Sequence, residues 1–105
     1  MTDKRLVLTT CGSLDEARTL ARTLVERQLA ACVNIVPQIE SVYRWQGDVE
    51  MATEWLLIIK TTLEVFDRVR EALLELHSYE LPECIEIGIE DGSAPYLEWI
   101  GESVR

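Results

Sequence analysis

Apolar residues recur along the chain with two different periods, and these periods predict the order of the secondary structure. Residues 6–10 form a short continuous run that is typical of a buried strand, and alternation over 32–45 and 49–61 predicts two long strands joined by a turn at 46–48. Helical spacing covers 14–28 and 65–76. A strand at 83–89 and a short helix over 96–104 complete the pattern.

Local signals sharpen the boundaries of these elements. Two stretches fit the capping box of a helix N-terminus, Ser13 with Glu16 and Thr61 with Glu64. Pro37 has no N–H group to donate to a neighbouring strand. We therefore expect the strand over 32–45 to bulge at Pro37 or to lie at an edge of the sheet.

The order βαββαβ, followed by a C-terminal helix, is that of the ferredoxin-like split βαβ fold, which belongs to the α+β class. Right-handed crossovers predict the sheet order 4-1-3-2, antiparallel throughout, with two helices on one face. The chain has 105 residues, of which 48% are hydrophobic, enough for one core. We expect a single domain over residues 1–105.

The charge balance excludes several classes of partner. Nineteen acidic residues against ten scattered basic ones give a net charge of −9, which repels nucleic acids and anionic membranes. Apolar runs such as Trp55 to Ile59 are far shorter than the ~20 residues that span a bilayer. Three cysteines and an N-terminus without a signal-peptide pattern favour a cytoplasmic protein.

The central hairpin is too long for its helices. The strand over 49–61 would extend about 44 Å at ~3.4 Å per residue, whereas the helix over 14–28 covers about 22 Å at ~1.5 Å per residue. Uncovered strand edges invite pairing, so we expect the hairpin tip to pair with another copy of the chain. The alternative is a hairpin that coils back over its own sheet. Candidate interface residues are Tyr43, Trp45, Met51 and Trp55.

Topology brings several chemically useful side chains to one end of the sheet. The first strand ends at Cys11, and the fourth strand starts at that same end, after a loop that carries His77, Tyr79 and Glu83. Thiol, imidazole and carboxylate groups suit copper or zinc better than magnesium. The helix that begins after Cys11 is expected to lower the pKa of its thiol. The alternatives are that Cys11 is a small buried hydrophobe and that His77 caps the preceding helix.

Five stretches in order carry a resemblance to a known family. They are Leu29 to Asn34, Ser41 to Gly47, Lys60 to Thr62, His77 to Glu83 and Tyr96 to Ile100. Over roughly residues 5–105 the chain resembles the divalent-cation-tolerance (CutA) family. The resemblance implies a ferredoxin-like, PII-like homotrimer with interlocked hairpins and a link to tolerance of copper and other divalent cations. It also implies copper ligands at the positions of Cys11 and His77.

The sequence leaves three hypotheses for function. The first is a trimeric protein that binds copper(II) or another divalent cation exchangeably, with no organic cofactor. The second is a PII-like signalling trimer that binds a small anion or metabolite in intersubunit clefts, for which Tyr79 and Glu83 are ligand-cleft candidates. The third is a structural or partner-docking trimer. Walker, G-x-G-x-x-G and H-E-x-x-H motifs are absent from the sequence, so we expect no enzymatic activity.

Overall fold

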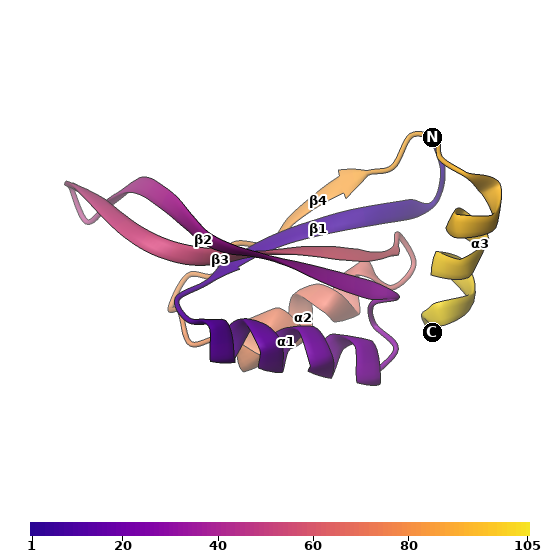
Figure 1. The fold of residues 1–105 in the computed structure, drawn as a ribbon, viewed down its shortest axis with the longest axis horizontal. Helices are drawn as coiled ribbons and strands as arrows, with labels where there is room; N and C mark the ends of the chain where they lie inside the picture. The colour runs from indigo at the N-terminus through magenta and orange to yellow at the C-terminus, as the bar shows by residue number, and fades with distance from the viewer.

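The computed structural model, which describes residues 1–105, has the element order that the sequence predicts. The elements are β1 (Lys4–Cys11), α1 (Leu14–Glu26), β2 (Cys32–Trp45), β3 (Asp48–Thr62), α2 (Phe66–Leu76), β4 (Ile85–Gly88) and α3 (Ala94–Ser103). The four strands form one sheet in the order β2-β3-β1-β4, and each neighbouring pair is antiparallel (Figure 1). The predicted fold class and strand order are therefore confirmed.

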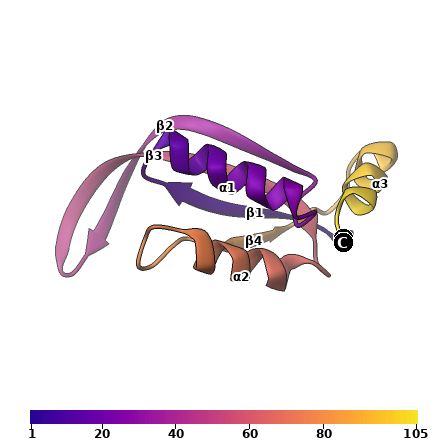
Figure 2. The same cartoon turned by 90° about the horizontal axis from the view of Figure 1, so that it is seen from below.

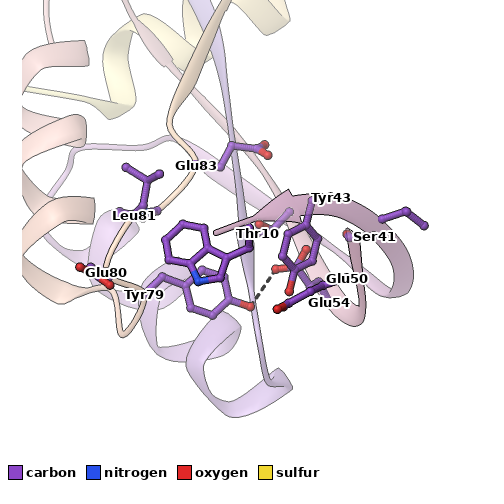
Figure 3. Close-up of a pocket in the computed structure, with 12 residues that line it drawn as sticks. Thr10, Ser41, Tyr43, Glu50, Glu54, Tyr79, Glu80, Leu81 and Glu83 are labelled. Atoms are coloured by element: carbon purple, nitrogen blue, oxygen red, sulfur yellow. Dashed lines mark hydrogen bonds between the residues drawn. The ribbon is translucent and has the colours of Figure 1, made fainter. Parts of the chain in front are cut away.

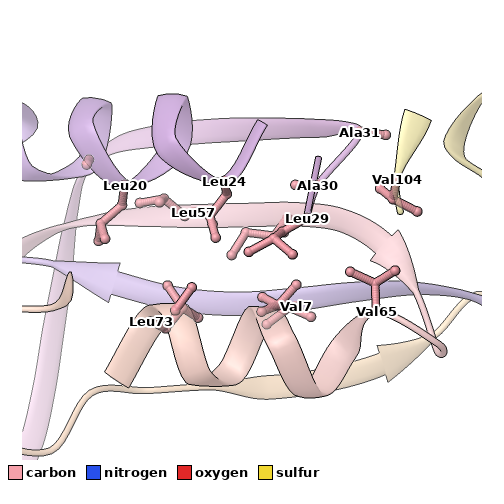
Figure 4. Close-up of a cluster of buried hydrophobic side chains, with 14 of the residues drawn as sticks. Val7, Leu20, Leu24, Leu29, Ala30, Ala31, Leu57, Val65, Leu73 and Val104 are labelled. Carbon is pink, nitrogen blue, oxygen red and sulfur yellow. The ribbon is translucent and has the colours of Figure 1, made fainter. Parts of the chain in front are cut away.

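Helices α1 and α2 lie side by side on one face of the sheet, as Figure 2 shows. Between these layers lies the core, where Val7 and Leu57 of the central strands face Leu20, Leu24 and Leu73 of the helices (Figure 4). All five side chains are at most 1% exposed. Because side chains alternate along a strand, the odd-numbered residues of β1 and the C-terminal half of β3 fill this core.

The two predicted helix starts differ in outcome. Ser13 caps α1 as expected, because its Oγ accepts a hydrogen bond from the Glu16 N–H at 3.1 Å. The second predicted capping box is wrong. Strand β3 continues to Thr62, and α2 begins after Val65, which makes no side-chain capping bond. The hydroxyl of Thr61 instead donates to the carbonyl oxygen of Leu29 at 2.7 Å.

Two other boundaries were predicted too wide. Helix α1 ends at Glu26 and not at Gln28, which has a left-handed φ of 59°. Strand β4 covers 85–88 and not 83–89, because β1 pairs with it only from Arg5 to Leu8. Residues 82–84, which precede β4, have no strand structure. None of the three helices is long and apolar enough to cross a membrane.

The β2–β3 hairpin reaches far beyond the rest of the sheet. Cys11, the last residue of β1, lies opposite Trp55, so residues 48–54 of β3 have no strand neighbour on that side. The molecule is consequently elongated, with extents of 44 × 25 × 23 Å. Figure 2 shows the hairpin curving toward the loop that follows α2.

The sheet face opposite α1 and α2 is also apolar, and we call it the open face. Its members on β1 and β3 alternate with the core residues of those strands, and its members on β4 pair with Leu6 and Leu8: they are Leu6, Leu8, Leu56, Ile58, Ile85 and Ile87. Ile85 is 49% exposed and Ile87 is 42% exposed. Antiparallel sheets with one solvated face normally carry polar residues there. An apolar open face is therefore a feature that requires explanation.

Candidate functional site

The end of β1 and the loop over residues 77–84 meet at one end of the sheet. The Nε2 atom of His77 lies 2.7 Å from the carbonyl oxygen of Thr10, the residue before Cys11. The Tyr79 ring packs on Gly12, where a Cβ atom would come within 3.1 Å of its hydroxyl oxygen. The structure thus brings the loop to the end of β1, whereas Cys32 lies at the opposite end beside Lys60.

Both ring nitrogens of His77 are engaged by the backbone. Nδ1 accepts a hydrogen bond from the Tyr79 N–H at 3.0 Å, so Nδ1 carries no proton. Because a carbonyl oxygen only accepts, Nε2 carries the proton and donates it to Thr10. The ring is almost fully buried. His77 therefore ties the loop to β1 as a neutral imidazole.

The thiol of Cys11 does not behave as the helix N-terminus alone would dictate. Burial raises the pKa of Cys11 to about 12, and the negative charges of Glu16 and Glu54 add to this increase. The expected lowering is therefore wrong, because loss of water and two carboxylates outweigh the partial positive charge of the α1 N-terminus. Cys11 is fully buried and holds its proton at neutral pH.

Glu16 is a site residue that the sequence did not reveal. Its Oε2 accepts from the Ser78 N–H at 2.8 Å and its Oε1 accepts from the Ser78 hydroxyl at 2.9 Å. Oε2 also lies 3.7 Å from Nδ1 of His77. The sequence signal for Glu16 was its place in the capping box, in which its carboxylate would accept a hydrogen bond from the Ser13 N–H. In the structure that carboxylate instead bridges to a loop 62 residues away.

The structure shows no ready-made metal centre. It contains no group of three or more His, Cys, Asp or Glu side chains arranged to hold a metal ion. Metal ligands must be deprotonated and free to coordinate, whereas Cys11 is protonated and both nitrogens of His77 are used. The residues implied by the resemblance therefore do not fit a bound metal in this conformation.

Next to this cluster lies a hollow of about 720 Å³, between the β2–β3 hairpin and the loop after α2 (Figure 3). We call it the acidic pocket. The side chains that give it its character are Tyr43, Trp45, Glu50, Glu54, Tyr79 and Glu83. Its twelve lining residues include four glutamates and no lysine, arginine or histidine. Both predicted ligand-cleft residues, Tyr79 and Glu83, belong to the lining of this pocket.

A β-bulge aims the hairpin side chains into this pocket. Val36 pairs with Leu56, but the next pair joins Ile39 to Glu54, so β2 has one residue more than β3 at this point. An extra residue moves the following side chains to the opposite face of a strand. As a result Tyr43 pairs with Glu50 and shares its face. The bulge expected from Pro37 is confirmed, with Gln38 at a φ of 53°.

The Glu54 carboxylate sets the electrostatics of the acidic pocket. The Tyr79 hydroxyl donates a hydrogen bond of 2.7 Å to Oε2 of Glu54, the contact dashed in Figure 3. Burial, followed by this bond and the charge of Glu54, raises the pKa of Tyr79 far above its usual range. Burial and Glu54 also raise the pKa of Glu83. The pocket therefore has a strongly negative potential.

The candidate interface residues fall into two groups. Tyr43 and Met51 lie on the distal hairpin and are 40% and 69% exposed, and Trp45 lies beside the turn. Trp55, in contrast, lies opposite Cys11 and packs against the core of its own chain. Of the four candidate interface residues, only Tyr43, Trp45 and Met51 therefore lie on the part of the hairpin that extends beyond the sheet.

Comparisons with known proteins agree on one family. The family model described as CutA1 divalent ion tolerance protein matches residues 5–103. The divalent-cation tolerance protein CutA of Thermus thermophilus is 46% identical over 100 residues, covering 95% of this chain and 97% of its own. The CutA homolog of Xenopus laevis is 47% identical over 95 residues, and the chain spans only 63% of its length.

A solved structure shows the same fold throughout. It is described as the periplasmic divalent cation tolerance protein CutA of Archaeoglobus fulgidus, and it superposes on this chain with a TM-score of 0.94 at 43% identity. The match covers 97% of this chain and 99% of that one.

Proposed function

Because the chain belongs to the CutA1 divalent ion tolerance family, we propose that it acts in the response to divalent metal ions and binds copper or a similar divalent cation exchangeably. The match over residues 5–103 carries this proposal. The net charge of −9 supports it, because it attracts cations from solution.

Cys11 and His77 remain the proposed ligands. Their support is the resemblance together with proximity, because His77 is hydrogen-bonded to the residue that precedes Cys11. Thiolate and imidazole are the ligands that copper prefers. Since both groups are engaged in the folded chain, cation binding requires the loop over 77–84 to open locally.

Calorimetric titration with copper(II) tests this proposal. We expect Cys11→Ser and His77→Ala to abolish or strongly weaken binding, and Cys32→Ser to bind like the parent because Cys32 lies at the other end of the sheet. If both site variants bind copper as the parent does, the proposed ligands are wrong. If the parent itself binds no divalent cation, the function is wrong.

We also propose that the working form is a homotrimer. The apolar open face and the uncovered hairpin with Tyr43 and Met51 support association, because an exposed apolar surface of this kind is typical of an interface. Sedimentation velocity at micromolar concentration should give three times the chain mass of 12.0 kDa. A single-chain mass would overturn this part of the proposal.

Two further parts of the proposal concern activity and location, and one alternative concerns the ligand. We propose a binding protein and not an enzyme, which the protonated Cys11 and the engaged His77 support, because neither acts as a nucleophile or base in this state. We propose a cytoplasmic location, since all three cysteines are free, and cell fractionation tests it. A thermal-shift screen with nucleotides and organic acids tests the alternative of a small-anion ligand, which the glutamates of the acidic pocket would repel.

A further inference from the structure

Glu54 is a buried carboxylate without a positive partner. The residue is only 7% exposed, yet none of the ion pairs of the chain includes it. Its one side-chain hydrogen bond comes from the neutral hydroxyl of Tyr79. Removing a carboxylate from water is costly unless the charge is compensated. A positive charge from outside the chain would supply this compensation.

The free oxygen of Glu54 opens into the acidic pocket. Oε2 accepts the bond from Tyr79, whereas Oε1 accepts none from the chain. Oε1 is not sealed in the interior, since the only fully buried unpaired side-chain oxygen is that of Thr9. Figure 3 shows the Glu54 side chain pointing to the same space as Glu50 and Tyr43. An unpaired acceptor atom therefore faces a hollow of about 720 Å³.

The rest of the lining indicates what kind of cation fits. Tyr43, Trp45 and Tyr79 bring aromatic rings to the pocket, and the faces of such rings attract ammonium and guanidinium groups. A bare metal ion fits poorly, because no three donor side chains converge there. A guanidinium group is planar, donates to a carboxylate and stacks on aromatic rings. The pocket combines both kinds of contact.

We propose that the acidic pocket binds an organic cation, a guanidinium or alkylammonium group, which donates hydrogen bonds to Glu54 and stacks against the aromatic side chains of Tyr43 and Trp45. The site is separate from the Cys11–His77 pair and does not depend on copper binding. The cation is either a free small molecule or an Arg or Lys side chain from a second copy of the chain. Both sources present the same chemistry to Glu54.

Calorimetry with butylguanidinium tests the free ligand, with butylurea as a neutral molecule of nearly the same shape. We expect the parent to bind butylguanidinium and not butylurea. Glu54→Gln keeps an acceptor for Tyr79 but removes the charge, and it should weaken binding at least about tenfold. Glu71→Gln, which removes an exposed charge of α2 outside the pocket, should change binding by less than about twofold.

Sedimentation velocity of the same variants tests the second source. If a neighbouring copy supplies the cation, butylguanidinium does not bind and Glu54→Gln, unlike Glu71→Gln, shifts the protein to smaller species. Should Glu54→Gln fail to fold, Tyr43→Leu replaces it, with weaker binding or a smaller assembly as the expected result. The inference is overturned if butylguanidinium and butylurea bind alike, or if neither binds and the assembly does not respond to the substitutions.

Discussion

Two threonines of the central strands are fully buried but differ in their hydrogen bonds. Thr61 of β3 donates its hydroxyl proton to the carbonyl oxygen of Leu29 at 2.7 Å. The hydroxyl of Thr9 in β1 has no partner. An unpaired buried hydroxyl costs free energy that a methyl group of the same size does not. The two positions therefore predict opposite effects of the same substitution.

We expect Thr9→Val to stabilise the protein by about 1 kcal/mol, because the lost hydroxyl made no bond and the new methyl fits the apolar core. Thr61→Val serves as the matched control. It should destabilise by about 1–2 kcal/mol, since it leaves the Leu29 carbonyl unpaired. Chemical denaturation of the two variants at one protein concentration measures both changes. A destabilising Thr9→Val would mean that the hydroxyl has a partner after all.

Glu83 predicts a pH dependence of stability. Burial and the charge of Glu54 raise its pKa above the ordinary value of 4.5, so the folded chain holds this proton more tightly than the unfolded chain does. The contribution of Glu83 to the free energy of unfolding is therefore greatest at low pH, and it is lost as the pH rises through the folded-state pKa. Glu83→Gln should therefore melt at a higher temperature than the parent at pH 7.

The same reasoning predicts that the difference disappears below about pH 4, where Glu83 is protonated in both states. Thermal melts of parent and variant from pH 4 to pH 7 measure the difference. Glu80→Gln, an exposed neighbour on the same loop, is the control and should show no comparable trend. A constant difference at all pH values would assign the effect to packing and not to charge.

At the scale of elements, the two predicted capping boxes show that a local sequence signature does not by itself determine where a helix begins. Ser13 and Thr61 carry the same signature, and only Ser13 caps a helix. Thr61 is in the ladder between β1 and β3, where it lies opposite Arg5, and its hydroxyl is used by Leu29. Pairing with a strand that is distant in the sequence outweighs a local preference that is worth about 1 kcal/mol.

The sequence likewise predicted only part of the candidate site. Strand order alone brings His77, Tyr79 and Glu83 to the end of β1, because antiparallel neighbours meet there. Glu54 was not recognised, because in the sequence it is only one polar position in an alternating strand. Which residues of β2 share its face depends on the bulge, and Pro37 indicates that a bulge exists without giving its length.

The bulge itself can be tested by deleting Gln38. The deletion removes the extra residue of β2, and one-to-one pairing then joins Val36 to Leu56 and Ile39 to Glu54 as in the parent, so Tyr43 stays on the face of Glu54. We expect the fluorescence of Trp45 to match that of the parent, in a background where the other two tryptophans are phenylalanine. Stability should fall by about 1–3 kcal/mol.

Pro37→Ala is the control for this experiment, because it keeps the number of residues between the two registers. Its Trp45 emission should match the parent. If the deletion moves the Trp45 indole into solvent, the hairpin does not keep its register when the extra residue is removed, and Gln38 is not the residue that the bulge accommodates.

At the scale of the whole molecule, the single chain leaves two apolar surfaces uncovered. Its sheet has apolar residues on both faces, and α1 and α2 cover only one of them. The hairpin adds an uncovered strand pair with Tyr43, Val42, Val49 and Met51 exposed. Both features follow from the sequence, the hairpin from its length and the open face from continuous apolar runs in β1 and β3. A sequence can predict that such a surface needs a partner, but not the symmetry of the assembly.

Ile87 and Leu74 provide a test of the open face, because both are exposed in the single chain, at 42% and 59%. Ile87 lies on the open face opposite Leu6, whereas Leu74 belongs to α2, which covers the other face of the sheet. If the open face is buried between copies, Ile87→Glu places an unpaired charge in that interface, and the assembly should lose at least about 2 kcal/mol per chain and dissociate in sedimentation velocity. Leu74→Glu adds the same charge to an exposed position of α2, so its mass and melting temperature should match the parent. Equal behaviour of the two variants would mean that the open face is solvated, and the association would then have to depend on the hairpin alone.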